Sequence, residues 1–129
     1  MIRIVTIIAI LTALPACAEY ERPSYNLVVK EDGLEIRDYA SAIVVETQVS
    51  ASRRDAAGEA FRSLFNYISG NNTSNLEIPM TAPVAQTPAG KGQDGVSGKW
   101  AIRFFLPSNY SVENIPQPLQ QGINIVTLE

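Results

Sequence analysis

The chain has 129 residues, with ten basic and thirteen acidic side chains, one cysteine and no histidine. The net charge of −3 argues against nucleic acid as a partner, because that binding depends on neutralising phosphates with lysine and arginine. The lack of histidine excludes catalysis by Ser-His-Asp or Cys-His sets and the usual zinc site. A single cysteine forms no internal disulfide, so the fold must depend on its hydrophobic core.

The N-terminus has the pattern of an export signal. Residues Ile4–Leu14, an apolar stretch of about eleven, follow a basic residue and are too few to span a membrane, which takes about twenty. The small residues that follow fit cleavage after Ala18. This makes residues 1–18 a signal peptide and residues 19–129 one periplasmic or secreted domain with nine basic and thirteen acidic side chains. The alternative is a lipoprotein that begins at an acylated Cys17, the only form anchored to a membrane.

Three segments near the start of the mature chain predict antiparallel strands. Tyr25–Val29 and Ile43–Val49 are rich in apolar residues, and Leu34–Tyr39 alternates apolar with charged residues as a half-buried strand does. Glu31-Asp32-Gly33 is a turn signal between the first two. Because the separations are short, we expect the three strands to form a meander.

The next segment predicts an amphipathic helix over residues 53–69. Ser52 is placed to cap its start, with Asp55 three residues on, and Gly70 supplies a left-handed stop. Gly58 inside this helix costs about 1 kcal/mol relative to alanine unless a neighbour packs closely there. Apolar residues recur at three- and four-residue spacing and form one stripe. They are Ala56, Ala57, Ala60, Phe61, Leu64, Phe65 and Ile68.

Beyond the helix the sequence predicts further strands and a loop. Leu76–Met80 is expected to be a brief strand, and Gln86–Gly98, rich in Gly, Pro, Gln and Ser, a mobile loop. Lys99–Leu106 is the most strand-like segment of the chain and is stopped by Pro107. Ile123–Leu128 begins another strand.

Four of these pieces, in this order, resemble the SOUL family of heme-binding proteins. They are Leu34–Tyr39, the helix with its Gly70-Asn71 end, Met80-Thr81-Ala82-Pro83-Val84, and Trp100–Pro107. The resemblance implies an α+β fold, a partial SOUL-type distorted antiparallel β-barrel with a flanking amphipathic helix. The chain holds the first pseudo-symmetric half and the opening strands of the second. Family members continue further, so we expect a C-terminally truncated domain, or a homodimer that completes the sheet.

The resemblance also implies that heme or a related tetrapyrrole binds in a hydrophobic groove along the helix. Heme is a flat apolar disc with two carboxylates, so its binder needs an apolar slot and cations at the rim. Phe61, Leu64 and Phe65 are the candidates to line the slot, Arg62 to pair with a propionate, and Met80 is the one thioether of the mature chain. The plainer interpretation is that the apolar residues are core and that the arginine is solvated.

Other residues bear on how heme would be held. Arg53 and Arg54 are further cations near the helix start, whereas Gly58 stands where some family members carry a cation. Tyr39 and Tyr67 are the phenolate candidates for an axial ligand. We expect heme to be bound non-covalently and held by burial, with weak ligation or none from the protein. Such binding is exchangeable and suits the buffering or carrying of heme.

No nucleophile, base or metal-ligand cluster is placed for catalysis, so we expect a binding protein and not an enzyme. An exported heme buffer or carrier is the leading interpretation. Two alternatives stay open. One is a module that binds or senses a non-heme apolar small molecule, and the other is a truncated fragment without function.

Overall fold

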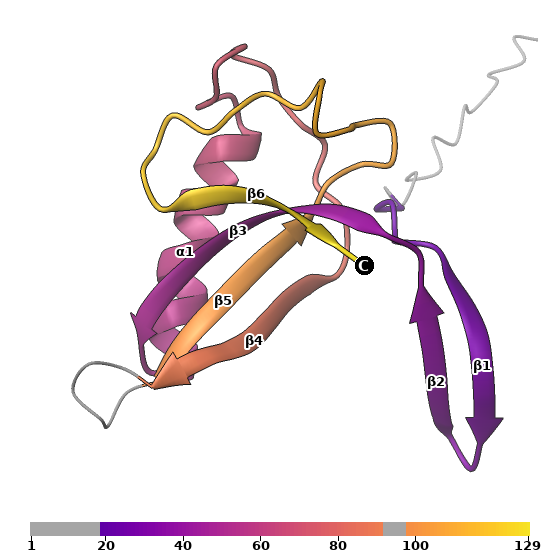
Figure 1. The fold of residues 1–129 in the computed structure, drawn as a ribbon. Helices are drawn as coiled ribbons and strands as arrows, with labels where there is room; N and C mark the ends of the chain where they lie inside the picture. Colours follow the sequence, from indigo (N-terminus) through magenta and orange to yellow (C-terminus); the bar gives the residue numbers. More distant parts are fainter. Residues whose placement is uncertain (1–18, 92–97) are drawn as a thin grey trace, which may run out of the picture.

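The computed structural model describes residues 19–91 and 98–129, so the expected export signal lies outside the described residues (Figure 1). One helix and two antiparallel sheets make up this part, which confirms the α+β class. No helix among these residues is long and apolar enough to cross a membrane. In chain order the elements are β1 (Tyr25–Glu31), β2 (Leu34–Tyr39), β3 (Ala42–Ala51), α1 (Arg53–Ile68), β4 (Val84–Lys91), β5 (Gly98–Phe105) and β6 (Ile123–Leu128).

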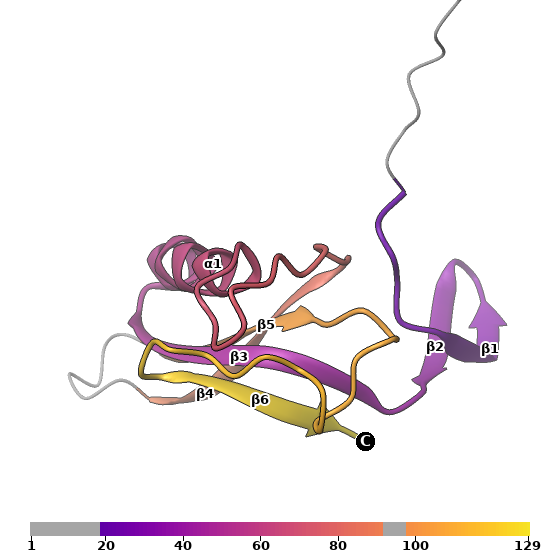
Figure 2. The ribbon, with the colours of Figure 1, turned by 90° about the horizontal axis from the view of Figure 1, so that it is seen from above.

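The main layer is a four-stranded antiparallel sheet with the order β4-β5-β3-β6. The helix α1 covers one of its faces and packs on the two central strands, β3 and β5 (Figures 1 and 2). The core lies between helix and sheet. Its buried members are Val45, Ala56, Ala60, Leu64, Tyr67, Ile68, Ile78, Ile102, Phe104, Leu106, Ile115 and Ile123.

The strands β1 and β2 form a separate hairpin that projects away from the four-stranded sheet (Figures 1 and 2). Every residue of both strands is exposed. The predicted meander is therefore wrong at its third strand, since β3 pairs with β5 and β6, and the predicted half-burial of β2 is also wrong. Alternation of apolar and polar residues predicts a strand, but it does not say which surface covers the apolar side.

The segment after the helix differs from its prediction in two places. Residues 76–80, expected as a strand, have no regular secondary structure, and the Ile78 N–H donates to Ile68 O at the end of α1 (2.7 Å). Conversely, residues 86–91 of β4 were predicted to be part of a loop. This strand lies at the sheet edge, where Pro88 and the irregularity between Pro88 and Gly90 are tolerated because no further strand must pair there.

The helix begins and ends as predicted. The Ser52 hydroxyl accepts from the Asp55 N–H (3.2 Å) and donates to the Asp55 carboxylate (2.7 Å), so one side chain caps the first turn. At the other end Gly70 takes φ of +117°, a conformation that L side chains rarely adopt. Both signals are local, which explains why the sequence sufficed to place them.

Asn72 fixes the turn that follows the helix. Its side chain is 1% exposed, and its amide donates to Tyr67 O (3.0 Å) and Leu76 O (2.7 Å). Its side-chain oxygen accepts from the Ser74 N–H (3.2 Å) and the Leu76 N–H (3.1 Å). One buried amide thus satisfies four backbone groups and sets the path of the chain from α1 to β4.

We predict that Asn72→Ala lowers the free energy of unfolding by about 2–4 kcal/mol, since it removes four hydrogen bonds and leaves buried backbone groups unpaired. Urea denaturation measures this loss. The exposed neighbour Asn71 is the control, and Asn71→Ala should change the stability by no more than about 0.5 kcal/mol. Equal losses in the two variants would contradict the role given to Asn72.

Candidate functional site

The margin of α1, between its buried stripe and solvent, carries two stacked aromatic rings. Phe61 and Phe65 lie one turn apart and are 39% and 46% exposed. Their ring centroids are 5.9 Å apart at an interplanar angle of 11°. Phe61 also meets Phe104 of β5 edge-on, with centroids 5.2 Å apart, and Phe104 is buried. The pair is therefore held by the core on one side and open to solvent on the other.

Val84 extends this apolar surface onto the sheet edge. It lies directly opposite Phe104 in the β4–β5 register, so both side chains are on the helix side of the sheet. Val84 is 42% exposed. Together Phe61, Phe65 and Val84 form a surface that we call the apolar shelf.

Two arginines and a glycine accompany the shelf on α1. Arg54, Gly58 and Arg62 recur at four-residue spacing, so they form a row along the helix beside the two phenylalanines, about 12 Å from end to end. Both arginines are exposed, and a Cβ added at Gly58 would meet no atom within 4 Å. Arg53 is engaged elsewhere, with its guanidinium 5.9 Å from the Trp100 ring centre. A flat aromatic surface, two cations and open space between them fit the shape and charge of heme.

The remaining predicted residues lie deeper. Leu64 is fully buried in the core, so it supports α1 and presents no surface in this structure. Met80 is half-buried and packs against the same core, and the neighbouring Thr81 hydroxyl donates to Phe105 O (2.6 Å). The structure thus brings Phe61, Phe65 and Arg62 to one surface, while Leu64 and Met80 take packing positions. Contact of any of the five with a ligand stays a prediction.

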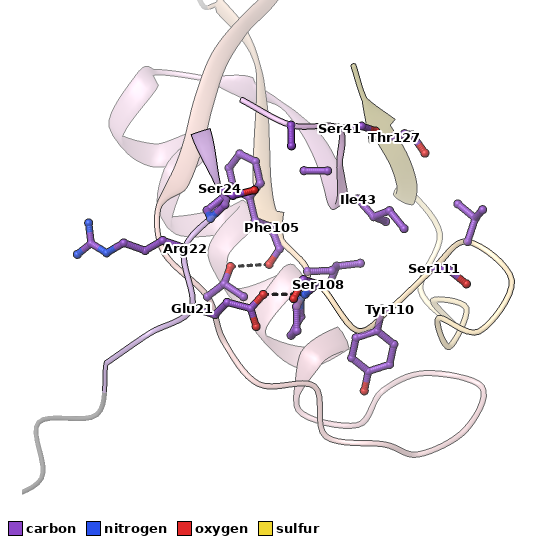
Figure 3. Close-up of a pocket in the computed structure, with 17 residues that line it drawn as sticks. Glu21, Arg22, Ser24, Ser41, Ile43, Phe105, Ser108, Tyr110, Ser111 and Thr127 are labelled. Atoms are coloured by element: carbon purple, nitrogen blue, oxygen red, sulfur yellow. Dashed lines mark hydrogen bonds between the residues drawn. The ribbon is translucent and has the colours of Figure 1, made fainter. Parts of the chain in front are cut away.

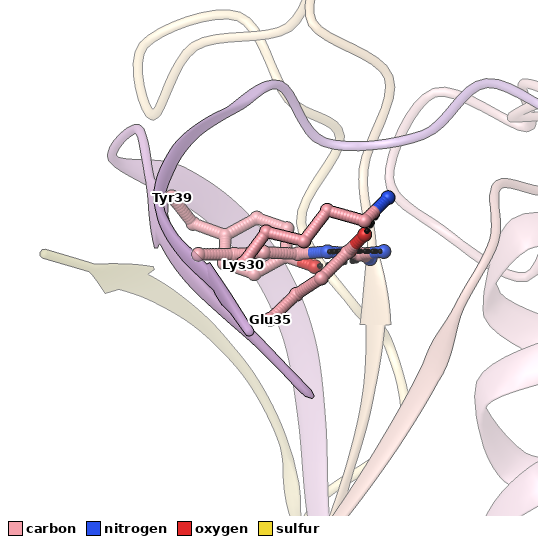
Figure 4. A network of polar contacts seen from close by, with 4 residues as sticks. Lys30, Glu35 and Tyr39 are labelled. Carbon is pink, nitrogen blue, oxygen red and sulfur yellow. Dashed lines mark hydrogen bonds and ion pairs between the residues drawn. The ribbon is translucent and has the colours of Figure 1, made fainter. Parts of the chain in front are cut away.

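Neither tyrosine considered as a phenolate ligand belongs to the shelf. The buried Tyr67 hydroxyl donates to Pro116 O (2.7 Å), and burial raises the pKa of Tyr67 to about 12, which keeps it a neutral phenol. Tyr39 lies on the hairpin, where its hydroxyl accepts from Arg37 at 3.5 Å (Figure 4). Among residues 19–91 and 98–129, no group of three or more His, Cys, Asp and Glu side chains could hold a metal ion.

Two cavities lie away from α1, at the base of the hairpin. The larger, of about 500 Å³, is lined by Glu21–Ser24, the start of β3 and residues 105–108 and 110–112 (Figure 3). The smaller, of about 350 Å³, is lined mostly by apolar residues such as Phe105 and Leu128, together with Tyr39 and Glu129. Neither includes any of the five predicted residues. The sequence gives no sign of the larger cavity, because its lining comes from segments far apart in the chain that tertiary contacts bring together. One such contact joins Glu21 to Ser108, whose N–H donates to the Glu21 carboxylate (2.8 Å).

Comparison with known proteins decides the family. A family model described as SOUL heme-binding protein matches residues 20–129. The chain belongs to the SOUL family. It is also similar to heme-binding protein 2 of Homo sapiens, with 34% identity over 93 residues, which cover 70% of this chain and 44% of that protein. The matched part therefore spans less than half the length of this curated relative.

For this SOUL family member, the open space at Gly58 predicts a stability effect. Gly58→Ala should raise the free energy of unfolding by up to about 1 kcal/mol, because alanine favours the helix and its Cβ meets no neighbour. Chemical denaturation measures the change. Gly70→Ala is the control and should destabilise, because its φ of +117° strains any side chain. A loss of stability in Gly58→Ala would mean that the helix surface is more crowded than described.

Proposed function

We propose that this SOUL family member binds heme or a related tetrapyrrole on the apolar shelf of α1. The observation that carries the proposal is the stacked pair Phe61 and Phe65, which is exposed on the helix where the family resemblance puts the ligand. Large aromatic side chains that lie side by side and exposed to solvent often mark a surface that binds a ligand or a partner. The family description and the name of the human relative support heme as that ligand.

Each part of the surface has a role in this proposal. The phenylalanine rings and Val84 would cover part of one porphyrin face, and Arg54 and Arg62 would pair with the propionates. Gly58 leaves the helix backbone open to close approach. Since the surface offers no imidazole or phenolate, heme would be held by burial and charge and would exchange readily. Exchangeable binding suits a protein that buffers or carries heme without transforming it.

We further propose that the protein acts outside the cytoplasm. The apolar stretch Ile4–Leu14 and the small residues before Glu19 support cleavage of an export signal, and a lipid anchor at Cys17 is the alternative. Mass spectrometry of the protein recovered from the periplasm or medium separates the two forms. A chain that starts at Glu19 supports the first, and an acylated Cys17 supports the second.

The first test is a titration of the purified protein with hemin, followed by absorption at the Soret band. A saturable shift at one heme per chain is expected. Phe61→Ser and Phe65→Ser should each weaken binding about tenfold, because each removes an aromatic face from the shelf. Val112, which is 51% exposed and lines the larger cavity, is the control, and Val112→Ser should leave the affinity unchanged. If Val112→Ser weakened hemin binding and the two phenylalanine variants did not, the heme site would lie in that cavity and not on the shelf.

Charge recognition has its own test. Arg62→Gln should weaken the binding of hemin about fivefold to tenfold, because a guanidinium–carboxylate contact is lost. The same variant should bind hemin dimethyl ester as well as the unaltered protein does, because the ester carries no propionate charge. Equal losses for hemin and its ester would contradict a charge contact at Arg62.

A second candidate function rests on the larger cavity. Its volume falls within the range of small-ligand sites, and its lining mixes apolar side chains with the serines at positions 24, 41, 108 and 111 (Figure 3). This cavity favours a non-heme small molecule as an alternative ligand. A panel of apolar compounds tested by thermal stabilisation, with Val112→Ser and Phe61→Ser in parallel, decides between the two sites.

A further inference from the structure

The apolar shelf is bordered on its solvent side by the exposed row Arg54, Gly58 and Arg62, which we call the arginine row. Each phenylalanine of the shelf comes three residues after a member of this row, so the two sets are neighbours on α1. The shelf itself lies on the sheet side, since Phe61 meets the buried Phe104 of β5. The surface is therefore apolar toward the sheet and cationic along its outer margin.

The sheet side of the shelf has no group that can pair with a negative charge. Phe61, Phe65 and Val84, which form it, are all apolar. The nearby amide of Gln86, two residues after Val84, donates to Arg53 O (2.7 Å) and ties β4 to the start of α1. A carboxylate placed on these side chains would lose its water and gain no partner in return. The shelf therefore disfavours a charged edge of a ligand.

The arginine row has the opposite property. The ion pairs found among residues 19–91 and 98–129 involve neither Arg54 nor Arg62. Their Cα atoms are about 12 Å apart with Gly58 midway. A Cβ at Gly58 would meet no atom within 4 Å, so no described neighbour requires a glycine there, although glycine is unfavourable inside a helix. Two carboxylates over this bare backbone can each reach one guanidinium.

We propose that this surface selects planar tetrapyrroles that carry two carboxylates together on one edge and are apolar on the others. The inference rests on the proposed binding of a tetrapyrrole to the shelf. The carboxylate edge lies over Gly58 between the two arginines, and the apolar edges lie on the shelf. Heme has this distribution of charge. A porphyrin with carboxylates on several edges would have to place at least one of them on apolar side chains.

A comparison of three iron porphyrins tests the selection, by titration of the purified protein at the Soret band. Hemin and iron mesoporphyrin IX both carry two propionates on one edge, so their affinities should agree within about twofold. Iron coproporphyrin carries two further propionates in place of the vinyl groups. It should bind at least about tenfold more weakly, because those charges lose water on the shelf. Equal affinity for hemin and iron coproporphyrin would overturn the proposed selection.

A cation added to the sheet side should relax the selection. Val84 is 42% exposed, so the edge of the sheet has room for a longer side chain. Val84→Lys should strengthen the binding of iron coproporphyrin about fivefold, because the ammonium pairs with an added propionate, and should not strengthen that of hemin. Val84→Gln, of similar length and without charge, is the control and should strengthen neither. A gain of affinity does not arise from damage to the fold, and its absence in folded Val84→Lys would contradict the selection.

The bare backbone at Gly58 has its own test. Gly58→Leu should weaken hemin at least about tenfold, because its side chain fills the space between the arginines. Gly58→Ala should weaken hemin about threefold while it raises the stability of the free protein, a combination that structural damage does not produce. Asn66→Leu is the control, because Asn66 is exposed and lies five residues after Phe61, on another side of the helix. Unchanged binding by Gly58→Leu would overturn the position given to the carboxylate edge.

The same titrations separate this inference from the function on which it rests. If hemin saturates the protein, Phe61→Ser weakens it and iron coproporphyrin binds as well as hemin, then the shelf binds heme and the selection is wrong. If hemin does not saturate the folded protein, or Phe61→Ser leaves its affinity unchanged, the proposed site is wrong and the selection fails with it.

Discussion

The packing of α1 on β3 and β5 is the contact on which the other features depend. It buries Ala56, Ala60 and Leu64 against Val45 and its neighbours, and this fixes the rotation of the helix. With that stripe inward, the residues about a third of a turn away, Phe61 and Phe65, must lie at the margin between core and solvent. The position of the apolar shelf is thus a consequence of core packing.

The same packing explains why the loop after α1 is ordered. Tyr67 lies at the end of the buried stripe, and its hydroxyl and carbonyl bind Pro116 and Asn72. Those two contacts tie the segment after β5 and the segment before β4 to one helix terminus. Residues far apart in the sequence therefore share one anchor, and β4 starts from a fixed point although it is an edge strand that contains Pro88.

The sequence correctly predicted the features that depend on neighbouring residues, namely the ends of the helix and two of the strands. The cap at Ser52, the stop at Gly70 and the strand pattern of β5 and β6 depend on neighbouring residues, and each was placed within one or two residues. The partners of β3 and the exposure of β2 depend on distant residues, so no periodicity revealed them. The apolar stripe also did not show that Leu64 is buried while Phe65 is exposed. Both residues fit its spacing, and only the packing of α1 on the sheet distinguishes them. The role of Asn72 was not predicted either, because its four hydrogen bonds depend on the path of the chain after the helix.

The two faces of the central sheet have different chemistry. On the helix side, α1 covers the hydrophobic core, and the apolar shelf at the margin of the helix is exposed to solvent. The opposite side keeps Glu46, which is 6% exposed, paired with Arg103 and with the Gln48 amide (3.1 Å). A buried carboxylate must keep such partners, so a molecule that approaches this face must leave the Glu46–Arg103 pair in place.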